Sequence, residues 1–266
     1  IRGNPIDGVV LLMGCDKTTP SLMMGAASVD LPTIGVSGGP MLNGHHQGET
    51  IGSGTGVWKL DADLNAGVIT EEDFINAEIS MSRSKGNCMT MGTASTMTAI
   101  AEAMGLCLPG ASSIPAADSN HIRMSVNVGK RIVEMVWEDL TPRNIITENS
   151  VENAVTVAMA MGCSTNAIIH LIAMARRAGV NLTMDDLDKK GRKIPLIANI
   201  RPSGKDYLME DFYYAGGILS LMSSLASQLN LEEITVSGMK LGELINGKET
   251  LNQDIIRPLD NPIYKE

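Results

Sequence analysis

The chain has 266 residues, of which 44% are hydrophobic and 19% are charged, and its formal net charge is −9. These values are ordinary for a globular protein of one large or two small domains. Because nucleic-acid binding needs a basic surface and a membrane span needs an uninterrupted apolar run, neither nucleic acid nor a membrane is an expected partner, and we expect a cytoplasmic protein.

The first forty residues predict a strand, a helix and a second strand. Residues 8–14 (GVVLLMG) form a short apolar run, typical of a strand buried on both faces. Residues 19–30 have Pro20 in a helical first turn, and residues 32–41 contain a second β-branched run. Such a βαβ unit implies a parallel sheet, in which ligands bind beyond the carboxyl ends of the strands. "GCDK" and "SGGPM" both lie at such ends.

The rest of the chain is predicted to be mainly helical. Residues 42–56 form a polar, glycine-rich loop, and a capping-box-like pair, Thr70 and Asp73, opens a helix within 69–83. Residues 84–105 contain a loop with Cys88 and then a helix. Further helices are predicted at 119–139, 149–161, 164–178 and 206–229, with a buried strand at 194–200. The predicted fold class is α/β, a helix-rich domain with a parallel sheet built from βαβ units.

The four cysteines are scattered along the chain, which favours reduced thiols or metal ligands over a disulfide framework. Cys15 follows the first strand, and Cys88 lies in a loop that leads into a helix. Helix N-termini favour the thiolate, the form that binds metals. The wide spacing excludes a zinc knuckle and leaves open either two ligands of an iron–sulfur cluster or two core thiols. Cys107 and Cys163 are interpreted as structural.

Asp16 and Lys17 add oxygen and nitrogen chemistry beside Cys15. Asp16 could cap the helix and Lys17 could be its solvated partner. A carboxylate next to a thiolate would also suit two different metals at one corner, oxygen for Mg²⁺ and sulfur for iron. A carbamate on Lys17 would be a further oxygen ligand.

Three other groups of polar residues carry weaker signals. "SGGPM" (37–41) suits either a turn whose amides cradle an anion or a tight turn alone. His45, His46 and Glu49 lie in a glycine-rich loop where adjacent histidines point apart, which argues against a metal site. "GCSTNAIIHL" (162–171) begins a helix, where capping explains the hydroxyl groups, while an Asn and a His four residues apart allow a polar strip facing a site.

The chain resembles the dihydroxy-acid dehydratase / 6-phosphogluconate dehydratase family over its whole length. The resemblance lies in "GCDKTTPSLMMGAASVDLPTIGVSGGPM", "GNCMTMGTASTMTAIAEAMGLCLPGASSIPA" and "GCSTNAIIHLIAMARRAG". The stretch "RSKGNCMTMGTASTM" is similar to the sugar-acid branch, the arabinonate and xylonate dehydratases. It lacks the Gly-Ser-Cys-Gly-Gly-Met type of sequence that branched-chain enzymes tend to have there.

The resemblance implies a particular site. Cys15 and Cys88 match two of the three cysteines that hold an iron–sulfur cluster, expected to be [2Fe–2S] in this branch. Asp16 matches a Mg²⁺ ligand, and Lys17 matches a carbamylated lysine that also binds Mg²⁺. The substrate is expected near Ser37, Gly38, Ser164 and Thr165.

The resemblance also implies that residues 1–266 are an internal piece: most of an N-terminal α/β domain without its beginning. The third cysteine and an acidic Mg²⁺ ligand are expected upstream. The base, a serine, and another Mg²⁺-binding glutamate are expected in a C-terminal β-barrel domain, so no catalytic base is assigned in this chain.

The implied activity is that of a hydro-lyase that converts a sugar acid, a 2,3-dihydroxy acid such as a pentonate, into a 2-keto-3-deoxy acid. Mg²⁺ would bind the carboxylate and 2-hydroxyl groups, the iron would act as a Lewis acid on the 3-hydroxyl group, and a base would take the C2 proton. The alternatives are a branched-chain dihydroxy-acid dehydratase and, from another class, an inactive isolated domain. We expect a homodimer or homotetramer, and an inactive fragment if these residues stand alone.

Overall fold

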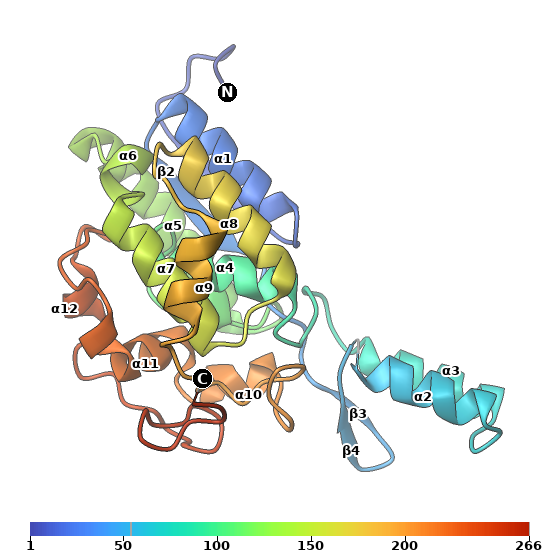
Figure 1. Cartoon of the computed structure of the whole chain (residues 1–266). Helices are drawn as coiled ribbons and strands as arrows, with labels where there is room; N and C mark the ends of the chain where they lie inside the picture. The colour runs from blue at the N-terminus through green and yellow to red at the C-terminus, as the bar shows by residue number, and fades with distance from the viewer. Residues whose placement is uncertain (54, 266) are drawn as a thin grey trace.

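The computed structural model describes residues 1–53 and 55–265, and about half of them lie in helices (Figure 1). The strands are β1 (Val9–Met13), β2 (Thr33–Ser37), β3 (Gly44–His46) and β4 (Glu49–Ile51). The α-helices are α1 (Thr18–Val29), α2 (Thr55–Asn65), α3 (Glu71–Met81), α4 (Thr93–Ala103), α5 (Ser119–Glu138), α6 (Pro142–Ile145), α7 (Glu148–Ala160), α8 (Thr165–Arg177), α9 (Met184–Gly191), α10 (Met209–Tyr214), α11 (Gly217–Ser224) and α12 (Leu241–Ile245). Two 3₁₀ turns are η1 (Ala111–Ser113) and η2 (Ala226–Gln228). The predicted helix-rich α/β class is confirmed.

A parallel pair of strands lies at the centre of the N-terminal part. β1 and β2 pair in parallel, with Val9 opposite Thr33 and Met13 opposite Ser37, and α1 connects them. The predicted βαβ unit is therefore confirmed. The expected burial of the first strand on both faces is wrong, because only the side that carries Leu11 and Met13 is buried, whereas Val10 and Leu12 are exposed. On the other side of β2, the Gly35 N–H donates to the carbonyl of Leu106 at 2.7 Å, so the chain after α4 continues along that edge.

Helix α4 is buried along almost its whole length. All of its residues from 94 to 103 are buried, and it contacts α1, α7, α8 and η1. Its sequence consists mainly of Ala, Thr, Ser and Met, whose small or adaptable side chains let four neighbours approach closely. The hydroxyl of Thr98 donates to the carbonyl of Ser95 at 3.1 Å, so this buried polar group is satisfied within the helix.

One acidic side chain lies in this core. Glu102 is 3% exposed. Its carboxylate accepts the backbone N–H of Gly110 and, at 2.8 Å, that of Ser112, and so fixes the turn that leads into η1. Burial raises the pKa of Glu102 to about 7, although both hydrogen bonds favour the charged form.

Residues 43–83 form an arm that projects from the body (Figure 1). The hairpin β3–β4 packs beside α3, and α2 packs on α3. The predicted capping box opens α3, because Thr70 accepts the N–H of Asp73 at 3.1 Å and Asp73 accepts that of Thr70 at 3.0 Å. The arm is tied to α10 through Asn43, whose N–H donates to Glu210 at 2.6 Å.

Three predicted elements differ from the structure. Residues 42–56 were expected to be a loop, but they contain the β3–β4 hairpin. Residues 194–200 were expected to form a strand, but they make only isolated bridges to distant segments. The helix expected at 206–229 is instead divided into α10, α11 and η2, and the break between α10 and α11 lies at Gly216, whose φ of 113° an α-helix does not allow.

Helices predicted at 119–139, 149–161 and 164–178 correspond to α5, α7 and α8. Among the described residues, no helix is both long and apolar enough to span a bilayer.

The buried carboxylate makes the stability of the fold depend on pH. The folded-state pKa of Glu102 lies above its ordinary value of 4.5, so the folded chain holds this proton more tightly than the unfolded chain does. Its contribution to stability is therefore complete below about pH 4.5 and declines as the pH rises to about 7.

We predict that the free energy of unfolding of the parent chain falls relative to that of Glu102→Gln by roughly 3 kcal/mol between pH 4.5 and pH 8. Urea unfolding followed by circular dichroism at both pH values measures this difference. A difference between the two proteins that is the same at both pH values would contradict the prediction.

Candidate active site

The turn at residues 37–41 joins the carboxyl ends of β1 and β2. The Gly38 N–H donates to the carbonyl of Met13 at 2.7 Å. A Cβ at Gly38 would lie 3.1 Å from the Cα of Gly14, so the two backbones approach as closely as glycine permits. The turn that contains Cys15 therefore borders the 37–41 turn, as expected for neighbouring parallel strands.

The loop that carries Cys88 is paired to the same turn. The Asn87 N–H donates to the carbonyl of Gly39, and the Met41 N–H donates to the carbonyl of Asn87, both at 2.9 Å. Gly86 has a φ of 133°, and a Cβ there would lie 2.5 Å from the nitrogen of Met41. The loops that contain Cys15 and Cys88 thus border one turn from opposite sides.

These backbone contacts decide between the two interpretations of "SGGPM". The amides of Gly38 and Met41 donate to Met13 and Asn87, and the amide of Gly39 donates to the Ser37 hydroxyl at 3.3 Å. Because each of these N–H groups already has a protein acceptor, the turn joins the loops rather than cradling an anion with its amides.

The four thiols differ in exposure. Cys15 and Cys88 are exposed, whereas Cys107 is buried and Cys163 is partly buried. Burial raises the pKa of Cys163 to about 11 and raises that of Cys107 well above its ordinary range. The latter two stay protonated at neutral pH, in line with the structural role expected for them.

Asp16 and Lys17 form an exposed ion pair beside Cys15. The Lys17 Nζ donates to Asp16 Oδ2 at 2.7 Å, and the Lys17 N–H donates to Oδ1 at 2.8 Å. The hydrogen bond from Lys17 lowers the pKa of Asp16, and the same bond raises the pKa of Lys17. The Cys15 thiol lies 3.5 Å from Asp16 Oδ1, so sulfur and oxygen donors are adjacent at this corner.

Two helices begin at this corner without a side-chain cap. Helix α1 starts directly after Lys17, and α4 starts after Gly92, and neither has a capping hydrogen bond from a side chain. In α1 the Thr19 N–H donates to the carbonyl of Cys15 at 3.2 Å and residue 20 is a proline, so α1 offers negative charge mainly the positive end of its dipole. The first-turn N–H groups of α4 have no side-chain acceptor at its N-cap.

The start of α8 packs against the start of α4. The hydroxyls of Ser164 and Thr93 lie 2.7 Å apart, and the amide group of Asn166 donates to Thr93 at 3.2 Å. Ser164 also caps α8, as expected from its position, by accepting the Asn166 N–H at 3.3 Å. Ser164 is thus tied to the helix that follows Cys88, while Thr165 is exposed.

Ser37 is completely buried, and its carbonyl lies 2.8 Å from Nε2 of His121 in the first turn of α5. No sequence motif singles out His121, Thr93 or Asn87. His121 and Thr93 lie in the first turns of predicted helices, and Asn87 lies directly before Cys88. These positions are weak signals, because each residue contributes through a contact with a distant segment of the chain.

Two buried polar atoms near these elements have no hydrogen-bond partner among the described residues: Oδ1 of Asn87 and Nε2 of His170. A buried polar atom without a partner is costly, and a bound group next to Cys88 could satisfy the Asn87 amide. Exposed thiols, a carboxylate and this amide oxygen suit iron bound by sulfur and Mg²⁺ bound by oxygen.

These donors make up only part of such a site. Within residues 1–53 and 55–265, no group of three or more His, Cys, Asp and Glu side chains converges in a way that could hold a metal ion.

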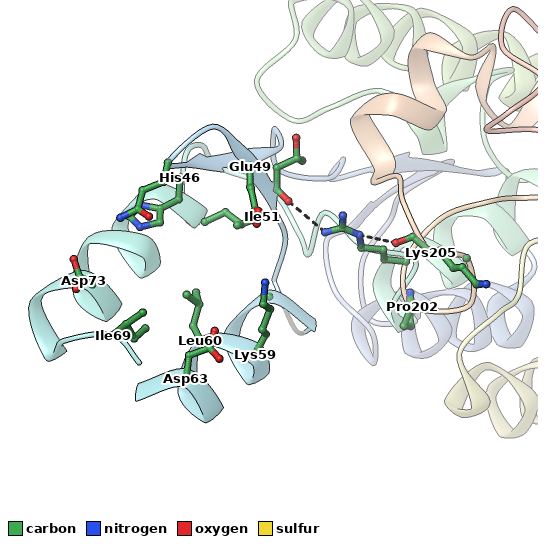
Figure 2. A pocket seen from close by; sticks show the side chains of 15 residues that line it. His46, Glu49, Ile51, Lys59, Leu60, Asp63, Ile69, Asp73, Pro202 and Lys205 are labelled. Carbon is green, nitrogen blue, oxygen red and sulfur yellow. Dashed lines mark hydrogen bonds between the residues drawn. The ribbon is translucent and has the colours of Figure 1, made fainter. Parts of the chain in front are cut away.

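A separate cavity of about 550 Å³ lies between the arm and the 201–205 loop (Figure 2). His46 and Glu49, opposite each other in the β3–β4 hairpin, line it together with Asp73. Arg201 closes one side by donating to the carbonyls of Thr50 at 3.3 Å and Lys205 at 3.1 Å. Neither exposed cysteine lines this cavity, so it is distinct from the corner at Cys15.

Comparison with known proteins adds independent information. Residues 1–244 match the family model described as dihydroxy-acid/6-phosphogluconate dehydratase N-terminal. The chain is 51% identical over 265 residues to the L-arabinonate dehydratase of Rhizobium leguminosarum bv. trifolii, covering 99% of this chain and 46% of that protein. It is 46% identical over 268 residues to the D-xylonate dehydratase of Caulobacter vibrioides, covering 100% and 45%.

A dihydroxy-acid dehydratase, from Caldanaerobacter subterraneus subsp. tengcongensis, is 41% identical over 261 residues, covering 97% of this chain and 47% of that protein. The chain therefore spans less than half the length of these relatives.

The exposure of the cysteines predicts their reactivity. In the native chain we expect two thiols, Cys15 and Cys88, to react rapidly with Ellman's reagent, and the other two only after unfolding. Cys15→Ser and Cys88→Ser should each remove one rapid equivalent, and Cys107→Ser should remove none. Rapid reaction of all four thiols in the folded chain would contradict this assignment.

The pairing of the Cys88 loop can be tested with two glycines. Gly86→Ala places a Cβ against the Met41 backbone, and it should lower the free energy of unfolding by about 3 kcal/mol and change the reactivity of Cys88. Gly48→Ala is the matched control, because Gly48 has a φ of 85° but no atom near its Cβ, so it should cost only about 1 kcal/mol. Equal losses in chemical denaturation would refute the close contact.

Proposed function

Because the chain belongs to the dihydroxy-acid/6-phosphogluconate dehydratase family, we propose that the complete protein is a hydro-lyase that removes water from a sugar acid. The substrate is a 2,3-dihydroxy acid of the pentonate class, and the product is a 2-keto-3-deoxy acid. The observation that carries this proposal is the convergence of the Cys15 and Cys88 loops on one turn, beside the carboxylate of Asp16.

The choice of a sugar acid rests on the relatives. The arabinonate and xylonate dehydratases share more identical residues with this chain than the dihydroxy-acid dehydratase does. The family resemblance in the "RSKGNCMTMGTASTM" stretch supports the same branch.

Two groups of residues fit the cofactors of this reaction. Cys15 and Cys88 would be iron ligands of an iron–sulfur cluster, proposed to be [2Fe–2S], and Asp16 and Lys17 would be oxygen ligands of Mg²⁺, with Lys17 as its carbamate. When bound, the cluster would supply a Lewis acid for the leaving 3-hydroxyl group, and Mg²⁺ would orient the carboxylate and 2-hydroxyl groups.

The state of Lys17 sets a condition on this site. Carbamylation needs the neutral amine, whereas the ion pair with Asp16 holds Lys17 as the ammonium. Asp16 must therefore exchange its partner before Lys17 becomes an oxygen ligand.

The chain's own residues would bind and orient the substrate. The positive dipole ends at the starts of α1 and α4 would offset the negative charge of a sugar acid, which the net charge of −9 would otherwise repel. Ser164 and Thr165, at the start of α8, would offer hydroxyl groups to the substrate, and Gly38 would act by letting the Gly14 backbone, next to Cys15, approach the 37–41 turn. The Ser37 hydroxyl would act by holding the turn, since it is buried and accepts the Gly39 N–H.

The cluster assignment predicts a difference between the chain alone and the complete protein. Two exposed thiols are too few for a stable cluster, so residues 1–266 reconstituted with iron and sulfide should show no stoichiometric iron–sulfide absorbance. In the complete protein, Cys15→Ser and Cys88→Ser should each lose iron, and Cys107→Ser should keep it. A stable stoichiometric cluster in the chain alone would overturn this part of the proposal.

The substrate assignment is tested with the polypeptide of the complete reading frame. After loading with iron, sulfide and Mg²⁺, it should form a 2-keto-3-deoxy acid from L-arabinonate or D-xylonate at least tenfold faster than it dehydrates 2,3-dihydroxyisovalerate, because one hydroxyl-binding site can discriminate by that factor or more. A preference for dihydroxyisovalerate would move the protein to the branched-chain class, and no turnover of any of these acids would sink the proposal.

A further inference from the structure

One side of the central strand pair exposes a continuous apolar surface. Six side chains make up what we call the β1–α5 surface: Val10, Leu12, Ile122, Val126, Val133 and Trp137. Leu12 is 71% exposed and Trp137 is 86% exposed, which is unusual for large apolar side chains in the middle of a strand and on a long helix.

The strand and the helix contribute to the same surface. Val10 and Leu12 lie opposite Ile34 and Val36 in the parallel register, so all four point to one face of the strand pair. Ile34 and Val36 are buried, whereas Val10 and Leu12 are not. Of the residues on this face, those of β1 are therefore left uncovered.

Helix α5 borders the uncovered strand. A Cβ at Gly8, just before β1, would lie 2.9 Å from Val136 and 3.2 Å from Ile132, so this flank of α5 rests against β1. The exposed apolar residues of α5 follow the same flank, at spacings of whole helical turns. The opposite flank is polar and carries Arg131 in ion pairs with Glu134 and Glu138.

Gly129 lies at the centre of the apolar stripe. It is exposed, and a Cβ there would meet nothing within 4 Å, so alanine would fit this helical position. Glycine costs about 1 kcal/mol relative to alanine within a helix. A glycine that nothing in the chain requires, between apolar residues, suits the close approach of another backbone.

The edge of β1 is also open. Among the described residues, β1 pairs only with β2, so one row of its backbone N–H and C=O groups has no strand partner. Parallel sheets are found almost only with both faces covered, and two strands alone are marginally stable. One further layer of structure could therefore both pair with the edge of β1 and cover the apolar surface.

We propose that the β1–α5 surface is covered by another segment of the same polypeptide, outside residues 1–266, which adds a strand to β1 and packs an apolar helix across α5. The relatives are more than twice as long as the matched region, which supplies ample chain for this layer. This inference rests on the family to which the chain belongs and on the greater length of its relatives, and it does not depend on the reaction that the protein catalyses.

Area and charge both favour this occupant. The exposed parts of the six side chains offer on the order of 600 Å² of apolar surface, close to one side of a standard interface of about 800 Å² per partner. Two copies of a chain with a net charge of −9 repel each other, while a segment of the same chain pays a smaller entropic cost on docking.

Hydrogen exchange tests the proposal without an activity measurement. In a chimera, residues 1–266 replace the matched region of the Rhizobium leguminosarum L-arabinonate dehydratase. The amides of 9–13 should exchange at least ~10-fold more slowly in the chimera than in the chain alone, and those of 122–137 should also slow. This protection should be independent of protein concentration, because the covering segment is in the same polypeptide.

Charged variants link the protection to the surface. Leu12→Glu with Val126→Glu should leave the melting temperature of the chain alone unchanged, since both side chains are already exposed, but should abolish the added protection in the chimera. Leu251→Glu, at an apolar position that is 78% exposed elsewhere, is the matched control and should leave the protection intact.

Equal exchange in the chimera and the chain alone would show that the surface stays free, and protection that disappears on dilution would assign it to a second copy. Either result would overturn the proposal.

Discussion

The candidate site depends on one short run of backbone contacts. The 37–41 turn hydrogen-bonds to Met13 on one side and to Asn87 on the other, and glycines at 38 and 86 allow both approaches. A side chain at 86 would separate the loops, because the nearest atoms belong to backbone that cannot rotate away, while one at 38 would require a shift of a few tenths of an ångström. The position of Cys88 relative to Cys15 is therefore fixed by backbone geometry rather than by the cysteines themselves.

The buried helix α4 holds this arrangement from behind. It begins just after the Cys88 loop, contacts α1, which begins just after Lys17, and meets the start of α8 through Thr93 and Ser164. Its small side chains let these helices approach closely, and Glu102 at its far end fixes the next turn of the chain. A shift of α4 would thus move one cysteine loop relative to the other, which ties the stability of the core to the geometry of the site.

At the candidate site, the local helix dipoles act against the negative net charge of the chain. The chain as a whole is acidic, yet the starts of α1 and α4 place the positive ends of two helix dipoles at the corner that contains Cys15, Asp16 and Lys17. Local dipoles can favour an anion even where the overall field opposes it, because their effect is confined to the first helical turn. The buried thiols of Cys107 and Cys163 lie outside this pattern, since burial keeps them protonated.

The sequence pattern predicted the βαβ unit, the helices α5, α7 and α8, and the capping of α3, since periodicity and capping are local properties. It also placed Cys15 and Asp16 directly after the first strand, but it wrongly predicted that both faces of this strand are buried. It failed at 194–200 and 206–229, where an apolar run pairs only with distant segments and the helix is broken at Gly216. The three-dimensional structure was needed to show that the amides of Gly38 and Met41 donate to Met13 and Asn87, that His121 contacts Ser37, and that β1 has an open edge beside exposed apolar side chains. Each of these depends on contacts between residues far apart in the chain, which no local pattern encodes.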